Sequence, residues 1–339
     1  MKSLIRFVLV GLLILVLFIA WRFFGSGTNF TENKRNFYVR TGSTFSDVIN
    51  TLERDSILAN PSSFAWAAQK IGYESNIHPG KYVISNGASI YHVLRLLNSG
   101  HQTAVDFIIT KLRTKADLAA KVGDNFECDS ATFMGLLNNN DSLSAYGLDT
   151  NTVMTAIIPN TYDIYWNTSS AKIFKKLYSG HQQFWNDERK QKANALNLTT
   201  GEVYTLASII EEETNAAQDK GNIASVYLNR LKNGMRLEAD PTIKFALHDF
   251  ALKRIYKIHI DSAAHSPYNT YLNNGLPPGP ICTPSSKTID AVLNAPSTDY
   301  LYFVAKPDNS GLSNFTGSFK QHQQNAEIYH KYLDNAEIK

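Results

Sequence analysis

Residues 206–215 read LASIIEEETN, an apolar helical run that passes directly into three consecutive glutamates. Thr199 and Glu202 precede this run with the spacing of a capping box, which predicts that a helix begins close to them. At about 100° per residue, the apolar side chains of this helix collect on one face, and Glu213 lies about 50° from the centre of that face. The other two glutamates lie about 110° and 150° from it. The sequence therefore predicts that Glu213 is the least solvated of the three.

Burial would give Glu213 a specific chemical use. Loss of solvent raises the pKa of a carboxylic acid and keeps it protonated near neutral pH, which is what a general acid requires. The residues alone leave a second interpretation open, in which Glu213 lies at a frayed helix end and is solvated. The rest of the chain decides between the two.

The N-terminus carries an uninterrupted apolar run, residues 7–21, with the sequence FVLVGLLILVLFIAW. With the aromatic residues that follow, the run is just long enough to cross a hydrocarbon core, so residues 7–24 are predicted to lie in a lipid bilayer. Lys2 and Arg6 favour a cytoplasmic N-terminus, although basic residues after the run weaken this bias. We therefore expect residues 1–25 to be a single-pass transmembrane anchor, with the remaining chain outside the cytoplasmic membrane.

A cleaved signal peptide is the alternative to an anchor. A signal peptide ends in a small-x-small cleavage site, whereas residues 21–24 of this chain are the bulky WRFF. The uncleaved anchor is therefore the favoured interpretation. Residues 25–35 are polar and are predicted to form a short tether that leads away from the membrane.

Charge and residue types exclude several classes of function. The net charge is +3, and no block of Lys and Arg with interleaved aromatic residues occurs, so nucleic acid is not an expected partner. Cys128 and Cys282 fit no metal-binding pattern, and whether they pair is left open. His259 and His265 lack the i, i+4 spacing of a helical zinc site. We expect neither a metal nor another cofactor.

Residues 36–103 have the predicted order strand, helix, helix, strand, helix. The strands are expected at residues 36–40 and 78–84, and the helices near residues 45–52, 62–71 and 89–97. This arrangement, with Gly-Ser-Thr at its first turn, resembles a LysM-like module, a small α+β fold associated with N-acetylglucosamine polymers. The resemblance leaves two roles open, glycan binding and a spacer that holds the rest of the chain at a fixed height.

Residues 104–339 form the second predicted domain, which opens with a strand at residues 104–109. Residues 114–148 are polar and are predicted to be helical. Residues 156–165, AIIPNTYDIY, are predicted to form a rigid, aromatic-rich turn of the kind on which sugar rings stack, although such clusters more often simply pack. A helix is predicted over residues 221–231, where the Asn-Gly pair that follows ends it.

Further along, local signals predict another helix and two loops. Asp240 is expected to be the N-cap of this helix, with Pro241 at its first position. The loops are SPYNTY at residues 266–271 and GLPPGPI at residues 275–281. A long loop that is ordered without a hydrophobic core of its own more often has a function than serves only as a connection.

The order of the motifs in the second domain carries a family resemblance. The motifs are ASIIEEET at residues 207–214, ASVYLNRL at 224–231, MRL at 235–237, DPT at 240–242, YNTY at 268–271, GLPPG at 275–279 and YLYFVA at 300–305. Together they resemble the MltG (YceG-like) endolytic transglycosylase family, and with the anchor and the LysM-like module the resemblance covers nearly the whole chain. It implies an α+β catalytic domain with a lysozyme-like helix that bears the essential Glu.

The resemblance implies a lyase that cleaves the bond between N-acetylmuramic acid and N-acetylglucosamine in nascent peptidoglycan strands at the bacterial inner membrane. Ordinary glycosidases use two carboxylates. This reaction needs one, which protonates the glycosidic oxygen and then takes the proton of the muramyl C6 hydroxyl, leaving a 1,6-anhydro end that terminates or trims strand growth. The family's Glu-x-Glu-Thr segment and the helical-face argument both select Glu213, with Glu211 as the fallback. Cell-wall synthases of the elongation or division machinery are the implied protein partners.

Other residues of the motifs are candidates for gripping the N-acetyl and hydroxyl groups of the sugars. They are Asn229, Asp240, Thr242, Tyr268, Asn269, Thr270, Pro277 and Gly279. For each, the competing interpretation is a scaffolding role, and Asp240 would be an adequate helix cap without any substrate. The chain departs from the family near its end, where SNFT at residues 313–316 replaces the common His-x-Phe-Asn, while His322 matches a family His. A catalytic role for this terminal segment is therefore unsupported.

Two other functions remain open at this point. One is a membrane-anchored peptidoglycan-binding scaffold, in which the LysM-like module carries the function and the carboxylates are inactive. The other is a hydrolytic muramidase, which requires a second carboxylate across the cleft. Asp240 and Glu238 are the candidates for that carboxylate.

Overall fold

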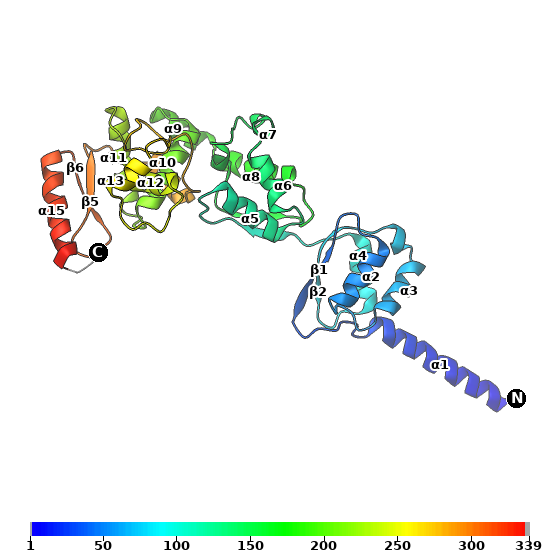
Figure 1. The fold of residues 1–339 in the computed structure, drawn as a ribbon. Helices are drawn as coiled ribbons and strands as arrows, with labels where there is room; N and C mark the ends of the chain where they lie inside the picture. The colour runs from blue at the N-terminus through cyan, green and yellow to red at the C-terminus, as the bar shows by residue number, and fades with distance from the viewer. Residues whose placement is uncertain (1, 336–339) are drawn as a thin grey trace. The chain divides into compact units, whose positions relative to one another are not determined.

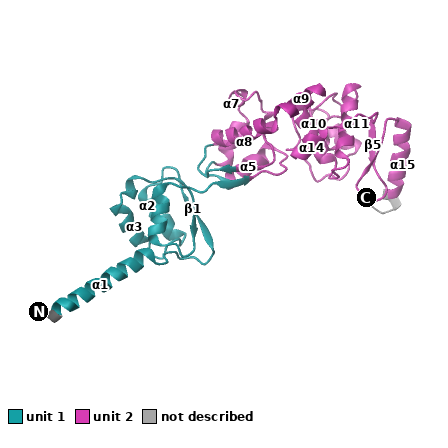
Figure 2. Cartoon of the chain, turned by 180° about the vertical axis from the view of Figure 1, so that it is seen from behind, with its two compact units in different colours: residues 1–107, 125–128, 163–169 teal, residues 108–124, 129–162, 170–339 magenta. Residues whose placement is uncertain are grey.

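The structure, a computed structural model, describes residues 2–335, so the first residue of the predicted anchor and the last four of the second domain lie outside it. The described chain is α+β and mostly helical, with three two-stranded sheets. It separates into two compact units (Figure 2). Unit 1 comprises residues 1–107, 125–128 and 163–169, and unit 2 comprises residues 108–124, 129–162 and 170–339.

Unit 1 contains a membrane-length helix and a small α+β module (Figure 1). Its elements are α1 (Lys2–Phe24), β1 (Lys34–Val39), α2 (Phe45–Arg54), α3 (Pro61–Lys70), η1 (Tyr73–Ser75), β2 (Gly80–Ser85) and α4 (Ile90–Ser99). The two strands pair antiparallel from Lys34 opposite Ser85 to Val39 opposite Gly80. The helices pack against this pair through a buried core that includes Phe37, Leu52, Phe64, Tyr82 and Leu97. The predicted order of strands and helices is confirmed.

Helix α1 contains the apolar segment Leu4–Phe24, which has a mean hydropathy of 2.8 and is the one segment of residues 2–335 long and apolar enough to cross a membrane. At about 1.5 Å per residue, its 21 residues span about 31 Å, close to the hydrocarbon thickness of a bilayer. Its last turn packs on the module, where the ring of Phe23 lies 5.7 Å from that of Trp66 and the ring of Phe24 lies 5.3 Å from that of Tyr91.

The prediction of a polar tether at residues 25–35 is wrong. The amide of Gly27 donates to the carbonyl of Ala88 at 3.0 Å, and its carbonyl accepts from the amide of Ala59 at 2.9 Å. Phe30 is buried in the core of the module, and β1 already begins at Lys34. Polar side chains do not prevent a segment from pairing through its backbone, which is why composition misled here.

Unit 2 begins with a helical part. Its elements are α5 (Lys115–Asn125), α6 (Ser130–Leu137), α7 (Asn140–Ser144), η2 (Val153–Ala156), α8 (Ser170–Phe184) and α9 (Asp187–Ala195). Strands β3 (Val105–Ile108) and β4 (Thr161–Ile164) form one sheet, whose residues are divided between the two units. The strand predicted at residues 104–109 is confirmed. The predicted aromatic turn at residues 156–165 instead contains β4, whose Tyr162 and Ile164 are buried on alternate positions.

The glutamate-bearing helix α10 (Thr200–Glu213) lies at the centre of the remaining part. Thr199 and Glu202 form the predicted capping box, with both reciprocal hydrogen bonds present. Residues 203–210 are all buried, so the helix is enclosed on every side and not on one face as predicted. Small residues such as Ser208 permit this close packing, and the Ser208 hydroxyl accepts from the amide of Ile281 at 3.0 Å.

The neighbours of α10 complete the unit. They are α11 (Lys220–Lys232), α12 (Asp240–Ala246), α13 (Lys257–Ser262), α14 (Ser286–Leu293), β5 (Tyr302–Ala305), β6 (Ser313–Thr316) and α15 (Phe319–Asn335). α10 contacts α11, α12 and α14, while α15 packs on the β5–β6 pair. The predicted N-cap role of Asp240 is wrong, because Ala239 is the N-cap of α12 and Asp240 is its first residue.

Candidate active site

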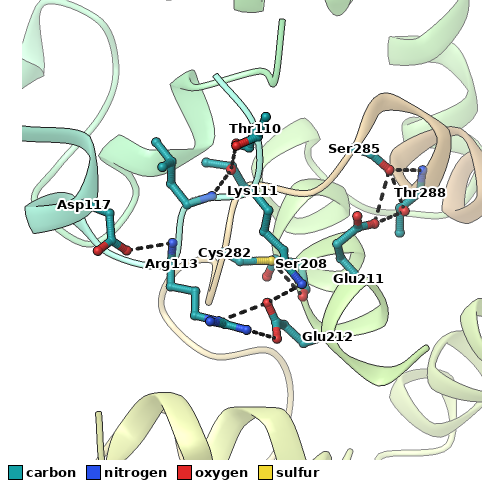
Figure 3. A network of polar contacts seen from close by, with 12 residues as sticks. Thr110, Lys111, Arg113, Asp117, Ser208, Glu211, Glu212, Cys282, Ser285 and Thr288 are labelled. Atoms are coloured by element: carbon teal, nitrogen blue, oxygen red, sulfur yellow. Dashed lines mark hydrogen bonds and ion pairs between the residues drawn. The ribbon is translucent and has the colours of Figure 1, made fainter. Parts of the chain in front are cut away.

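Two of the three glutamates at the end of α10, Glu211 and Glu212, are ion-paired. Figure 3 shows the contacts of Glu212 with Lys111 and Arg113 and those of Glu211 with Ser285 and Thr288. Glu212 accepts from Lys111 and Arg113, each at 3.1 Å. Glu211 lies 2.8 Å from the ammonium of Lys220 and accepts a short hydrogen bond from Thr288. These contacts tie the end of α10 to α11, to α14 and to residues 111–113.

Ion pairing keeps both of these carboxylates charged. Burial alone would raise the pKa of Glu211, but hydrogen bonds from Lys220 and Thr288 outweigh it and hold the pKa below its usual value. The same balance, with Arg113 and Lys111 as donors, lowers the pKa of Glu212. Neither carboxyl group is therefore a proton donor at neutral pH.

Glu213 has a different environment. Its Oε1 accepts a hydrogen bond of 2.6 Å from the hydroxyl of Tyr227 on α11, and none of the ion pairs within residues 2–335 includes it. Burial raises the pKa of Glu213 to about 7; the hydrogen bond from Tyr227 opposes this shift, and the negative charge of Asp240 adds to it. The residue as a whole is only partly buried, so it keeps access to solvent. A carboxyl group in this state exchanges a proton near neutral pH.

Asp240 provides a second, distinct carboxylate beside Glu213. Its Oδ1 accepts a hydrogen bond of 2.5 Å from the hydroxyl of Tyr271. Burial raises the pKa of Asp240, and the bond from Tyr271 opposes this. The positive charges of Lys244 and Arg230 also act on Glu213 and lower its pKa. The site thus combines two carboxylates and two phenols from α10, α11, α12 and the loop after α13.

Comparison with known proteins identifies the fold on which this site is built. The sequence profile of the YceG-like family matches residues 37–328. The chain belongs to the YceG-like family. Over 309 residues it is 27% identical to the endolytic murein transglycosylase of Bacillus subtilis strain 168, a match that covers 87% of this chain and 84% of the relative.

Two further similarities concern part of the sequence and the fold. Over 154 residues the chain is 32% identical to the endolytic murein transglycosylase of Streptococcus pneumoniae strain R6. This match covers 44% of this chain and 27% of the relative. A crystal structure of a YceG-like protein from Listeria monocytogenes has a similar fold, with a TM-score of 0.58 over 87% of this chain and 99% of that one, at 24% sequence identity.

Several residues predicted to grip the sugar are enclosed in the protein. The Thr242 hydroxyl donates to the carbonyl of Ala239 at 2.7 Å and lies 2.8 Å from the hydroxyl of Thr270, which accepts from the amide of Ala239 at 3.0 Å. The Asn269 amide group donates to two backbone carbonyls, at 3.0 and 3.2 Å. All three predicted residues are buried. Thr242 and Thr270 hold the start of α12 against the YNTY loop, and Asn269 ties the same loop to the end of α13, so the three residues together position Asp240 and Tyr271.

The other candidates divide between packing and partial exposure. Pro277 and Gly279 are buried, and a side chain at Gly279 would meet the carbonyl oxygen of Asn151 at 2.1 Å. The Asn229 amide group donates to two backbone carbonyls of the segment before β5, at 3.0 and 2.9 Å. Tyr268 is partly buried, and its ring packs 4.7 Å from that of Phe245. Of the predicted binding residues, Asp240 has the most direct relation to Glu213.

The prediction missed Tyr227 and Tyr271, although both lie in the family-like motifs. Tyr227 lies on the buried side of α11, where it reads as an ordinary core aromatic residue. A signal was present in the YNTY loop, since two tyrosines flank its two buried polar residues. Only the crossing of α10 and α11 brings the Tyr227 hydroxyl to Glu213, and local sequence does not encode that distance.

The fallback Glu211 lines a hollow of about 380 Å³, and Glu213 is not among the residues that line it. Its other lining residues include Lys111, Asn160, Thr161 and Ser285. The terminal segment where the chain departs from the family forms β6, and His322 stacks on Tyr302 with ring centroids 5.1 Å apart. Cys128 and Cys282, both within the described residues, carry no disulfide.

Proposed function

We propose that this protein is an endolytic peptidoglycan lytic transglycosylase. It cleaves the bond between N-acetylmuramic acid and N-acetylglucosamine in nascent glycan strands, leaves 1,6-anhydro-N-acetylmuramic acid ends, and so terminates or trims strand growth. The observation that carries this proposal is the environment of Glu213, whose pKa lies near 7 while those of its two neighbours are lowered. Its similarity to the endolytic murein transglycosylase of Bacillus subtilis supports the choice of substrate.

The proposed reaction uses Glu213 twice. Protonated Glu213 donates its proton to the glycosidic oxygen as the bond to the anomeric carbon breaks. The resulting carboxylate then removes the proton of the muramyl C6 hydroxyl, whose oxygen attacks the anomeric carbon and closes the anhydro ring. No water is consumed, and Glu213 ends the cycle protonated. A pKa of about 7 suits both steps, because neither protonation state is strongly disfavoured at neutral pH.

The second carboxylate has an electrostatic role in this proposal. The transition state carries positive charge at the anomeric carbon and ring oxygen. Asp240, held by Tyr271 at 2.5 Å, offers negative charge that favours such a state once ionised. Buried Thr242, Asn269 and Thr270 fix the two elements on which Asp240 and Tyr271 lie, and thereby act on the reaction indirectly.

The remaining parts of the chain suit this activity. We propose that residues 1–25 are a single-pass anchor in the inner membrane, with residues 36–103 as a LysM-like module and residues 104–339 as the catalytic domain on the extracytoplasmic side. The apolar helix Leu4–Phe24 supports the anchor. Peptidoglycan is then the substrate, and cell-wall synthases of the elongation or division machinery are the proposed protein partners.

Asp240 also favours a second candidate, a hydrolytic muramidase. In that reaction Asp240 acts as the nucleophile or as the base for a water molecule, and Glu213 remains the acid. The similarity to an endolytic murein transglycosylase favours the first candidate over this one.

Mass spectrometry of purified glycan strands after incubation with the full chain in detergent tests the proposal. Anhydro ends with no gain of water support the transglycosylase, whereas reducing ends identify a hydrolase. Intact strands from a folded protein would leave only the peptidoglycan-binding scaffold. A shortened protein for the same assay should begin at about residue 25 and not at residue 36, because a start at 36 removes the first residues of β1 and the buried Phe30.

A further inference from the structure

The module of unit 1 has an apolar surface beside the end of α1. A groove of about 540 Å³ lies between the last turns of α1 and helices α3 and α4, within the size range of about 300–1,000 Å³ for ligand sites. Phe23 and Phe24 form one side of it, and residues of α3 and α4 form the other. A second hollow of about 320 Å³ adjoins it and shares Phe23 and Trp66.

Helices α3 and α4 present the same pair of residue types to this groove. On α3, Trp66 is followed four positions later by Lys70; on α4, Tyr91 is followed four positions later by Arg95. Residues four apart lie on one face of a helix, so each helix offers an aromatic ring and a cation side by side. Trp66 is 57% exposed, Tyr91 49% and the neighbouring Ile71 53%. About half of each of these three apolar side chains is therefore exposed to solvent.

The groove is continuous with the membrane-length helix. Residues 19, 20, 23 and 24 of α1 line it, and they form the last two turns of the apolar segment. If that segment crosses the bilayer, its last turns reach the boundary between acyl chains and headgroups. No tether intervenes, because Gly27 is already hydrogen-bonded to the module, and Arg22 donates a short hydrogen bond to Asn60. With α1 inserted in this way, no spacer separates the module from the membrane surface.

We propose that this face of the module docks onto the bilayer, with Trp66, Ile71 and Tyr91 inserted among the headgroups and upper acyl chains. Lys70 and Arg95 contact lipid phosphates. Tryptophan and tyrosine prefer this boundary, and lysine and arginine extend their charges from it towards anionic headgroups. The module is then a fixed platform on the membrane, so any glycan that it meets lies close to the bilayer. The inference rests on one part of the proposed function, the insertion of α1.

The test is tryptophan fluorescence of the full chain in phospholipid vesicles with and without bromine atoms on the upper acyl chains. The chain has four tryptophans, and single Trp→Phe variants assign the quenching to each. We expect strong quenching of Trp21 in α1, quenching of Trp66 at a comparable level, and none of Trp166, which packs on Tyr38 in the same unit. For each protein, the fluorescence in brominated vesicles is divided by that in unbrominated vesicles, which removes differences in intrinsic brightness between the variants.

Each outcome decides a separate point. Quenching of Trp21 without quenching of Trp66 overturns the docking and leaves the anchor intact. Absence of quenching at Trp21 overturns the insertion of α1, and the docking with it. Quenching of Trp21 and Trp66 but not of Trp166 supports the docking.

A second arm tests the phosphate contacts in vesicles of phosphatidylcholine with and without phosphatidylglycerol. The double variant Lys70→Gln, Arg95→Gln should lose about half of the Trp66 quenching when phosphatidylglycerol is present and little when it is absent. The control is Arg40→Gln, Lys81→Gln, which removes the same charge from the Val39–Gly80 end of the β1–β2 pair, outside the groove. Equal quenching in both double variants would overturn the role of Lys70 and Arg95.

Discussion

The hydroxyl of Tyr227 on α11 donates a hydrogen bond of 2.6 Å to Oε1 of Glu213 at the end of α10. A donor of this kind favours the ionised carboxylate and therefore opposes the rise in pKa that burial causes. The result is a pKa of about 7 in place of a still higher one. The bond thus keeps both protonation states of Glu213 accessible at neutral pH, which a group that donates a proton and then accepts one requires.

Replacing Tyr227 by Phe should move the alkaline limb of the pH dependence of kcat/KM to higher pH. The reason is that Glu213 must enter the reaction protonated, and loss of the hydrogen bond raises its pKa further. Tyr204→Phe is the matched control, because it also removes a buried phenol, one that donates to the carbonyl of Ile157 and not to Glu213. We expect both variants to lose about 1 kcal/mol of stability, but only Tyr227→Phe to shift the limb. An unshifted limb in Tyr227→Phe would mean that the group titrating in the profile is not Glu213.

Glu213→Gln should stabilise the protein at alkaline pH. The folded-state pKa of about 7 lies above the usual value of 4.5, so the proton stabilises the folded state. The free energy of unfolding of the wild type therefore falls as pH rises from about 4.5 to about 7. Removing the ionisable group should recover about 3 kcal/mol at pH 8 and almost nothing at pH 4. Denaturant unfolding at the two pH values measures this difference.

Glu211→Gln serves as the contrasting variant for the same measurement. The pKa of Glu211 is lowered in the folded state, so its contribution is present above the usual value of 4.5 and lost as pH falls through the folded-state pKa. Loss of the ion pair with Lys220 should destabilise the protein at pH 8. If both variants changed stability in the same direction at pH 8, the assigned environments of the two glutamates would be incorrect.

Much of this architecture was readable from local signals. The Thr199–Glu202 capping box was correctly predicted, and the helices predicted at residues 62–71 and 89–97 begin within one residue of the predicted positions, because each signal depends on a few adjacent residues. The single-face interpretation of α10 failed because its neighbours cover it from all sides, and sequence periodicity does not report how many neighbours a helix has. Glu213 was selected in part by an argument that does not hold, and its environment now supports the choice on other grounds.

The predicted binding residues show where sequence reasoning stops. Asn269 and Thr270 were predicted to bind the sugar because they are polar residues in a loop. Their side chains instead form hydrogen bonds with backbone groups of the protein. A polar loop residue that binds a ligand and one that ties the loop together have the same local sequence. The relation of Tyr227 to Glu213 is long-range and depends on helix packing, so only the fold reveals it.

Gly279→Ala should strongly destabilise unit 2. A Cβ atom at this position would lie 2.1 Å from the carbonyl oxygen of Asn151, and a backbone atom cannot move aside at low cost. We expect a loss of about 3 kcal/mol or more. Gly135→Ala in α6 is the control, because a Cβ there meets open space and alanine favours a helix by up to about 1 kcal/mol. Thermal unfolding of the two variants should therefore shift in opposite directions, and a neutral Gly279→Ala would contradict the packing of the GLPPG loop.

Limited proteolysis should leave residues 25–35 intact. The backbone of this segment is paired with residues 57–59 and with Ala88, so a protease does not gain the extended, unpaired chain that cleavage requires. The fragments are identified by mass spectrometry of the detergent-solubilised full chain. Rapid cutting between Gly25 and Arg35 under conditions that leave the β1–β2 pair intact would show that this segment is a flexible tether. That result would also argue against a module fixed at the membrane.

In the proposed mechanism, Glu213 alone supplies and recovers the proton. The most direct test compares the release of 1,6-anhydro ends by Glu213→Gln, by Glu211→Gln and by the wild type. All three proteins are compared at equal folded concentration on the same glycan strands. We expect Glu213→Gln to lose activity by about 10³-fold or more while remaining folded, and Glu211→Gln to stay within about tenfold of the wild type. Substantial anhydro-end formation by Glu213→Gln, together with an inactive Glu211→Gln, would contradict the assignment and transfer the role to Glu211.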